Sequence, residues 1–453
     1  MKRILGTLLA LVVAVGPLPA SAAMLHAEGF ETQSKVLACP NGNGGTETTF
    51  ETSVQRSGGA ALKLTHTGTN SRGSCAMLGS WAQTGTIIVF TAIRLSTFGS
   101  CTNLTVTSPI LDLGEVTLND TCSSSTNNHT ISVRENGQDI GTNWTGLNDQ
   151  SGTYYPIAIK IVTDAGGAAS VSWRVSADGQ NWTDQGTSTG RTIANVDQVI
   201  AYHPQSLSGI SQTSAYFDDI LILNGSGTAW PDPRTFVNMR GGKASTPTYN
   251  EWTKVGGTNI YDSNVWGVRT GLASTTYSGT CTAGSNAGVA CKVDSECPSS
   301  VCAGWAISPQ SDGSSGQAEQ TMKIAAWDSG TPTPTIPASA TGVNAIWGCR
   351  WQTLVGRTTS TNRSYALRYA WNSTPSDTSI SLSAETYTSQ STILDLNGGT
   401  PSSDLSKLNT LEVGGVRTST AAGANMVIRD HWVQCAWSEA GSGGFLVWTQ
   451  DDE

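Results

Sequence analysis

Apolar and polar residues alternate along most of the first half of the chain. Ile157, Ile159 and Ile161 form one apolar series with Ala158 and Lys160 between them. A period of two places successive side chains on opposite faces of a β-strand. The same pattern recurs in residues 62–65 and 171–175, and residues 86–95, 115–118 and 130–133 are further expected strands. These segments predict enough short strands for two packed sheets.

Residues 215–224 differ because their apolar residues follow one another without alternation. Every residue from Ile220 to Leu223 is apolar, which predicts an interior strand that is covered on both faces. Asp218 and Asp219 precede this run, and in a regular strand their side chains point to opposite faces. A buried carboxylate needs hydrogen bonds, solvent or a cation, because an unpaired buried charge is costly.

One short helix is expected in the second half of the chain. Asp404 offers an N-cap, and Leu405, Leu408 and Leu411 recur every three residues. Gly414 and the glycine after it predict where the helix ends. Strands are expected on both sides of this helix.

The composition and the N-terminus indicate an exported, turn-rich β protein. Charged residues make up 13% of the chain, which also contains 50 glycines. Residues 1–22 combine a basic start, an apolar run and small residues, which predicts a signal peptide cleaved after Ala22. We therefore expect a secreted or cell-surface location, with a periplasmic one as an alternative. No later segment is apolar and long enough to span a membrane, and a net charge of −9 gives no support for nucleic-acid binding.

The ten cysteines fall into three local groups with even counts. Even groups in an exported chain favour disulfides over metal ligation. Three pairings are open for each group of four, and the last group predicts a Cys349–Cys435 disulfide if it bonds within its own region. The groups are Cys39, Cys75, Cys101 and Cys122; Cys281, Cys291, Cys297 and Cys302; and Cys349 and Cys435.

Two large domains are expected from the chain length, with a boundary near residue 240. Residues 23–240 form the first and residues 241–453 the second. Residues 277–305 contain four cysteines among glycine, serine and asparagine, so disulfides must stabilise this insertion. Residues 328–341 are rich in proline and threonine and predict an extended connector.

Two short motifs in the first domain resemble those of a known group of folds. The domain begins with Ala27-Glu-Gly-Phe-Glu31 and contains Phe217-Asp-Asp-Ile220 near its end. In this it resembles the concanavalin-like, laminin G-like jelly rolls of secreted carbohydrate-binding modules and of phage tail (minor structural) proteins. Residues 250–266 and 342–369 resemble the β-sandwich that follows the jelly roll in those tail proteins. The resemblance implies an all-β chain, a jelly-roll β-sandwich followed by a second β-sandwich, from which the signal peptide and the cysteine-rich insertion depart.

The resemblance also implies a structural Ca²⁺ ion. In the carbohydrate-binding relatives an N-terminal acid and the first aspartate of the late strand often coordinate calcium, which corresponds here to Glu31 and Asp218. Hard oxygen ligands suit this ion. The alternative is that both carboxylates cap backbone amides or pair with Arg56 or Arg94.

The sequence contains no motif for hydrolytic catalysis. We find no paired carboxylates on alternate positions of a strand, no nucleophile motif and no metal-binding spacing among the five histidines. Trp144 and Trp182 lie in polar surroundings and are candidates for ligand contact, because exposed indole rings stack on sugars. Packing of these rings on a sheet edge is an equal alternative.

These observations predict a non-catalytic protein that binds a polysaccharide or a glycosylated surface through its jelly roll. The second sandwich is expected to serve as a structural or assembly module, with self-assembly of the chain as a further expectation. One alternative is a purely structural phage-tail-like or cell-surface component without a sugar ligand. A second alternative is a polysaccharide hydrolase or lyase, for which Lys160, Tyr202 and His203 are candidates if they share one groove.

Overall fold

A computed structural model gives the structure of much of the chain. It describes residues 23–30, 37–38, 48–56, 61–65, 75–95, 106–123, 128–145, 153–177, 181–202, 214–225, 230, 235–239, 253–255, 279–281, 284–285, 290–291, 302–303, 305–307, 318–323, 343–357, 364–371, 374–382, 388–394, 407, 410–417 and 426–439. The predicted signal peptide, the 328–341 connector and Glu31 lie outside these residues. Within them no helix is long and apolar enough to cross a lipid bilayer.

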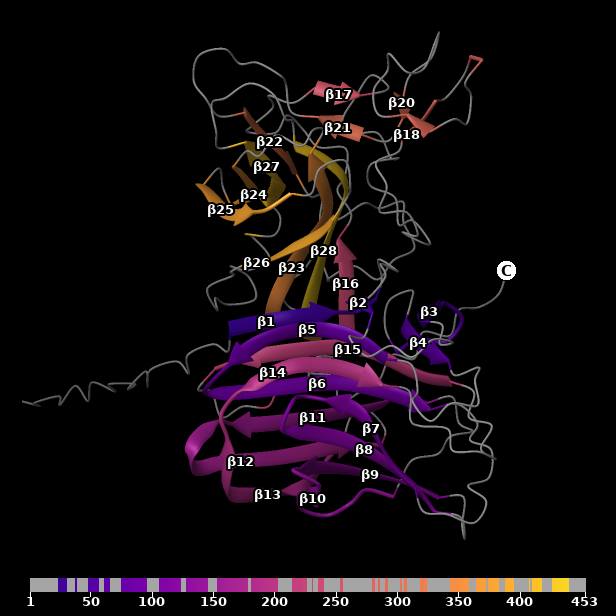
Figure 1. The fold of residues 1–453 in the computed structure, drawn as a ribbon, viewed down its shortest axis with the longest axis vertical. Helices are drawn as coiled ribbons and strands as arrows, with labels where there is room; N and C mark the ends of the chain where they lie inside the picture. The colour runs from indigo at the N-terminus through magenta and orange to yellow at the C-terminus, as the bar shows by residue number, and fades with distance from the viewer. Residues whose placement is uncertain are drawn as a thin grey trace, which may run out of the picture.

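The first half of the chain is a jelly-roll β-sandwich of two antiparallel sheets (Figure 1). Sheet A contains, in spatial order, β13 (Trp182–Ile193), β12 (Asp164–Ser176), β11 (Tyr155–Val162), β6 (Thr86–Leu95), β15 (Ser214–Asn224), β4 (Ala61–Thr65) and β3 (Thr48–Glu51), with β1 (Ala23–Glu28) also paired to β15. Sheet B contains β10 (Gln138–Asp139), β9 (Asn128–Glu135), β8 (Val116–Ser123), β7 (Val106–Asp112), β14 (Val196–Tyr202), β5 (Cys75–Gln83) and β2 (Leu37–Ala38). The chain passes repeatedly from one sheet to the other, so strands distant in sequence become neighbours.

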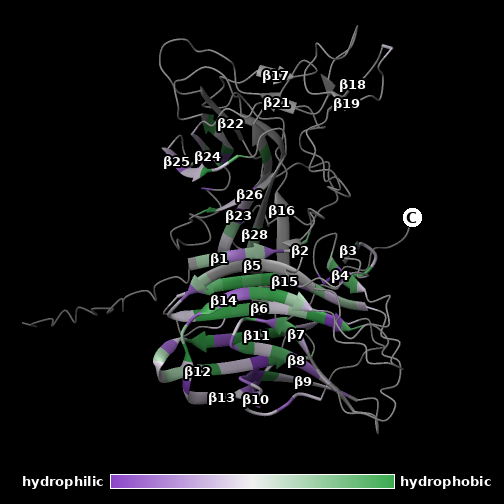
Figure 2. Cartoon of the chain, viewed as in Figure 1, coloured by the Kyte–Doolittle hydropathy of each residue, from purple (hydrophilic) through white to green (hydrophobic). Residues whose placement is uncertain are grey.

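Alternation in the sequence becomes burial on one face, as predicted. In β12, Val171, Trp173 and Val175 are buried, and in β11 the three isoleucines point into the same core. Residues of both sheets form this core, and the Trp173 indole Nε1 donates a hydrogen bond to the Ile140 carbonyl oxygen at 2.7 Å. Strand β15 is an interior strand, paired with β6 on one side and with β4 and β1 on the other. Figure 2 shows the hydrophobic residues concentrated along β6, β11 and β15.

The second half of the chain is a second set of antiparallel sheets. Sheet C contains β17 (Thr253–Val255), β21 (Trp305–Ile307), β28 (Met426–Glu439), β23 (Val343–Arg357) and β26 (Thr388–Leu394), with β16 (Thr235–Met239) also paired to β28. Sheet D contains β22 (Ala318–Lys323), β27 (Glu412–Arg417), β24 (Tyr365–Trp371) and β25 (Thr374–Ile380). Strand β16 precedes the predicted boundary at residue 240 and pairs within this second set.

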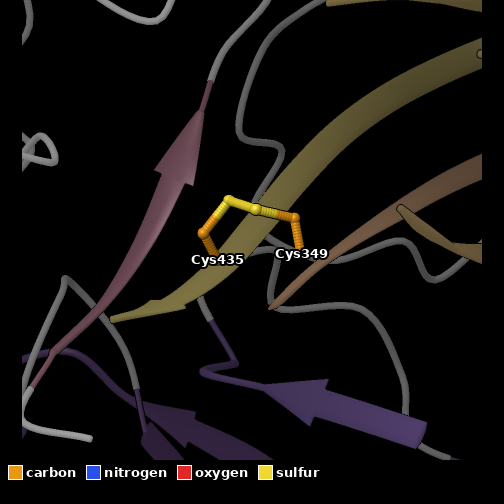
Figure 3. Close-up of a disulfide and its surroundings, with 2 residues drawn as sticks. All are labelled: Cys349 and Cys435. Atoms are coloured by element: carbon orange, nitrogen blue, oxygen red, sulfur yellow. A yellow bond between two sulfur atoms is a disulfide. The ribbon is translucent and has the colours of Figure 1, made fainter. Parts of the chain in front are cut away.

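The predicted disulfide between Cys349 and Cys435 is confirmed (Figure 3). The two cysteines lie directly opposite each other in the pairing of β23 with β28, and both are fully buried. In the cysteine-rich insertion, a small sheet contains β19 (Ala290–Cys291), β18 (Gly279–Cys281) and β20 (Cys302–Ala303). The disulfide pairing in this insertion and in the first domain stays open.

The expected end of the helix in the second half is wrong. Lys407 has a helical conformation and the Thr410 amide donates to its carbonyl oxygen, but Gly414 and the next glycine lie inside β27. This strand is paired on both sides, with β22 and with β24. Hydrogen bonding to two neighbours therefore outweighs the tendency of glycine to end a regular element.

The two halves meet where β23 crosses the edge of β1 (Figure 1). The Arg350 guanidinium donates from Nη1 to the Ala27 carbonyl oxygen at 2.9 Å and to the Glu28 carboxylate at 3.0 Å. Arg350 and Glu28 are both more than nine-tenths buried. Gly348 lies so near Met24 that a Cβ atom at Gly348 would be 2.6 Å from the Met24 Cβ. The two halves are therefore in close contact, and the contact includes a buried ion pair.

Candidate ligand-binding face

We call the face of sheet A that points away from sheet B the outer face. Aromatic and cationic side chains lie in contact with one another on this face. Odd-numbered residues of β6 such as Val89 and Ile93 enter the sandwich core, so the even-numbered ones lie on the outer face. Strand pairing then aligns residues of neighbouring strands in rows across this face. One row joins Ala158, Phe90 and Leu221, and it is apolar throughout.

Part of the outer face is covered by the second half of the chain. The apolar residues on it form a buried cluster with Ala436 of β28, and four partly buried side chains pack against that cluster. Because the cluster spans both halves, it forms a second, smaller core between them. The four partly buried residues are Trp182, Trp230, Trp347 and Ile393.

Two of these tryptophans combine with two cations into what we call the Trp182 group: Trp182, Trp230, Arg174 and Lys160. The Arg174 guanidinium carbon lies 4.1 Å from the Trp182 ring centroid and 5.0 Å from that of Trp230. The Lys160 ammonium lies 5.8 Å from the Trp230 ring. These distances are within the range of cation–π attraction. The Trp182 ring also meets Phe90 edge to face, at 6.1 Å between centroids.

A second group, called here the tyrosine row, crosses the other end of the outer face. It consists of Tyr154, Arg94, Tyr216 and Lys63, since β15 aligns Tyr216 with Arg94 on one side and with Lys63 on the other. Tyr154 immediately precedes Tyr155, which is paired with Ile93. The Tyr216 ring has Arg94 at 4.5 Å and Lys63 at 5.6 Å from its centroid. Aromatic and cationic side chains therefore alternate across strands β6, β15 and β4 and the residue that precedes β11.

Hydrogen bonding in the tyrosine row leaves Arg94 incompletely satisfied. Its Nε and Nη1 atoms are buried and have no hydrogen-bond partner among the described residues. The Tyr154 hydroxyl donates to the Val54 carbonyl oxygen at 3.1 Å. Burial, and then the nearby Asp218 carboxylate, raise the pKa of Tyr154 far above its ordinary value, so its phenol stays protonated.

The expectation that Asp218 and Asp219 point to opposite faces is wrong. The pairing of β15 with β6 shifts between Asp218 and Leu221, and Asp219 has a positive φ of 52°. Aspartate tolerates this left-handed conformation, and a bulge of this kind re-aims side chains. Both carboxylates consequently contact Arg56: the Asp218 Oδ2 accepts from its backbone amide at 2.7 Å, and Asp219 forms an ion pair with its guanidinium.

The same contacts test the fit of the calcium prediction at Asp218. The carboxylate is fully buried, and its second oxygen accepts a hydrogen bond from the Asp219 amide at 2.8 Å. Asp218 thus caps backbone amides, which is one of the alternatives given above, and the Arg56 ion pair belongs to its neighbour Asp219. The described residues contain no group of three or more histidine, cysteine, aspartate or glutamate side chains that would hold a metal ion. Glu31 lies outside these residues, so calcium stays a prediction.

Trp144, the other candidate for ligand contact, lies away from Trp182. Its backbone bridges to Ile131 of sheet B, and its ring packs on the sandwich core with 5.1 Å between its centroid and that of Tyr155. Gly141 and Gly186 touch so closely that a Cβ on Gly186 would be 2.7 Å from the Gly141 Cα. This contact fixes the segment that carries Trp144.

Two of the residues named for a lyase, Lys160 in sheet A and Tyr202 in sheet B, lie in different sheets. His203 lies outside the described residues. The sequence indicates Arg94 only as a possible partner of Glu31 or Asp218, and it does not indicate Arg174 or Tyr216, because only the alignment of distant strands places them in rows. It also missed a buried pair in the other sheet, in which His129 Nδ1 lies 2.9 and 3.0 Å from the two Asp120 oxygens.

Comparisons with known proteins find structural likeness only. No protein-family model matches the chain, and no curated protein sequence matches it. An endo-β-1,4-glucuronan lyase from the fungus Trichoderma reesei is 11% identical, with a TM-score of 0.32 over 45% of this chain and 96% of its own. Cellulose-induced protein Cip1 is 18% identical, with a TM-score of 0.32 over 45% of this chain and 100% of its own. The catalytic domain of a family 131 glycoside hydrolase from Coprinopsis cinerea is 10% identical, with a TM-score of 0.31 over 46% of this chain and 100% of its own. At these identities and scores the likeness extends to the β-sandwich architecture and carries no argument about function.

Proposed function

We propose that the chain is an exported, non-catalytic protein whose jelly-roll sandwich binds a glycan on the outer face of sheet A. The observation that carries this proposal is the Trp182 group. Trp182 and Trp230 are partly buried, and Arg174 lies against both rings. Rigid amphipathic rings beside hydrogen-bond donors suit a sugar, which presents both C–H faces and hydroxyl groups.

The second sandwich acts as a structural support for this face. It covers the apolar part of the outer face through Ala436, Trp347 and Ile393. Arg350 also satisfies a carbonyl oxygen on the edge strand β1. An edge strand with unpaired backbone groups is prone to pair with other chains, so this contact protects β1.

The test is a glycan-array screen of the mature protein, purified with its disulfides intact, run with calcium and again with chelator. We expect binding to a defined sugar class, lost in Trp182→Ala and retained in Trp144→Ala, whose ring packs on the sandwich core. Dependence of binding on calcium, removed by Asp218→Asn, would support the predicted ion at Glu31 and Asp218. Absence of binding under both conditions overturns the glycan function.

The purely structural alternative predicts a different outcome from the same preparation. A chain that serves only in assembly gives no array signal and forms a defined oligomer or filament in light scattering. A monomer with an array signal favours the binding module.

One observation favours the hydrolase or lyase alternative. The bulge brings two carboxylates, Asp218 and Asp219, to the same residue, Arg56, and glycoside hydrolysis needs a pair of carboxylates. Both carboxylates are nevertheless fully buried, and a general acid or base must reach its substrate. Release of new reducing ends or unsaturated sugars from incubated polysaccharides would replace the binding function with catalysis.

A further inference from the structure

The cysteine-rich insertion contains four cysteines whose pairing the sequence leaves open. Cys281 ends β18, Cys291 ends β19 and Cys302 begins β20, while Cys297 lies outside the described residues. Figure 1 shows β18 and β20 at the end of the second half that is away from the jelly roll. Three of the four cysteines therefore lie in one small sheet, and the register of that sheet limits how they can pair.

Cys281 and Cys302 lie directly opposite each other in the pairing of β18 with β20. Directly opposed residues of antiparallel strands have Cα atoms about 4.5–5.5 Å apart, which is within the range of about 4.4–6.8 Å that a disulfide needs. The confirmed disulfide between Cys349 and Cys435 joins two cysteines at the same kind of position. The register therefore permits a Cys281–Cys302 bond without movement of the backbone.

Cys291 is too far from both of these cysteines. In the pairing of β18 with β19 it lies opposite Gly279, so it is diagonal to Cys281, and diagonal neighbours are about 7–8 Å apart. Cys291 and Cys302 lie on strands that flank β18 on its two sides, which separates them by at least about 9 Å. Cysteines whose Cα atoms are more than about 7 Å apart cannot be bridged unless the backbone moves. The register therefore disfavours both a Cys281–Cys291 bond and a Cys291–Cys302 bond.

Four cysteines can pair in three ways, and two of the three ways contain one of the disfavoured bonds. Pairing in sequence order needs the Cys281–Cys291 bond, and crossed pairing needs the Cys291–Cys302 bond. We propose that the insertion contains nested disulfides, in which Cys281–Cys302 encloses Cys291–Cys297. This assignment follows from the register of the three described cysteines alone.

The outer bond, Cys281–Cys302, closes the insertion at its base. One residue separates Ala303 of β20 from Trp305 of β21, and β21 is paired with β28 in sheet C. Each bond forms when two thiols lose two protons and two electrons, and an oxidised disulfide accepts the electrons through thiol–disulfide exchange. Such bonds persist in the oxidising compartments that exported proteins reach. The insertion is then a closed loop whose two ends are joined beside sheet C.

The test is peptide mapping by mass spectrometry of the unmodified protein, exported through its own signal peptide. Free thiols are blocked with N-ethylmaleimide before digestion, because thiol–disulfide exchange needs a free thiolate. Trypsin cuts after Lys292, between the first two cysteines of the insertion and the last two. We expect the fragments on either side of this cut to stay linked and to separate only on reduction.

A second digestion distinguishes nested from crossed pairing. Thermolysin cuts before Val289 and before Val301, which separates the two cysteines within each tryptic fragment. We expect one linked peptide pair that contains Cys281 and Cys302, and another that contains the two inner cysteines. The digestion uses the unmodified protein, so the result does not depend on whether cysteine variants fold.

The internal control is the linked tryptic peptide pair that contains Cys349 and Cys435, whose recovery shows that no exchange occurred during digestion. With this pair recovered, release of unlinked fragments on either side of Lys292 shows pairing in sequence order and overturns the proposal. A linked pair that contains Cys281 and Cys297 shows crossed pairing and overturns it as well. Blocked free thiols throughout the insertion show that it contains no disulfide, which is the third result that overturns the proposal.

Discussion

Replacing Arg350 with methionine is expected to weaken the contact between the two sandwiches. The substitution removes the hydrogen bonds from Nη1 to the Ala27 carbonyl oxygen and to the Glu28 carboxylate. It leaves Glu28, which is 7% exposed, as a buried charge without its arginine partner, while the Phe30 amide still donates to its carboxylate at 2.9 Å. Breaking a buried pair by removal of one partner costs about 3–5 kcal/mol.

A double-mutant cycle isolates the interaction from the loss of packing. Glu28→Gln removes the other charge, so the double variant Arg350→Met/Glu28→Gln contains neither charge of this pair. We expect the double variant to be more stable than the sum of the single changes predicts, by about 1–3 kcal/mol of coupling energy. The control is Arg134→Met, at an ion pair exposed by 31% and 39%, which should cost less than about 1 kcal/mol.

The assay is urea unfolding followed by tryptophan fluorescence, together with thermal unfolding. A loss of about 3–5 kcal/mol corresponds to a fall in midpoint on the order of 10 °C for domains of this size. If Arg350→Met changes the free energy of unfolding no more than Arg134→Met does, the contact does not hold the two halves together and the reasoning is refuted.

Three further predictions follow from contacts elsewhere in the fold. Replacing both cysteines of the β23–β28 disulfide with alanine should lower the free energy of unfolding by about 4–5 kcal/mol, because the bond closes a sequence separation of 86 residues; a loss below about 1 kcal/mol in urea unfolding would contradict this. Gly186→Ala should destabilise the protein by about 1–3 kcal/mol and alter tryptophan fluorescence, because the new Cβ meets the Gly141 backbone. Gly137→Ala, which also has a positive φ but nothing within 4 Å of the new Cβ, is its control, and equal effects would show that the close contact does not matter. Burial, and then Arg350, lower the pKa of His26 well below 6.5. As the pH falls below about 6.5, the unfolded state binds this proton and the folded state does not. The free energy of unfolding should therefore fall by up to about 1.4 kcal/mol per pH unit. His26→Gln should remove that part of the pH dependence, and an unchanged slope would argue against it.

The sequence by itself determined several strands of the first sandwich and the Cys349–Cys435 disulfide. The alternation of Ile157, Ile159 and Ile161 is a local property. A strand in a sandwich needs one apolar face whichever strands are its neighbours, so the pattern can be recognised from the segment alone. Cys349 and Cys435 formed the last even group, and each had one partner left within its region. Neither inference needed to know which strands are neighbours.

The tertiary structure decided the features of the candidate site. The bulge that brings Asp218 and Asp219 to Arg56 arises where β15 changes its partner from β4 to β1. The alignment of Arg94 with Tyr216, and the contact of Arg350 with Glu28, join residues that are more than a hundred positions apart. Register between such distant strands is fixed by the packing of the whole sandwich rather than by local preference, so no segment of the sequence specifies it alone.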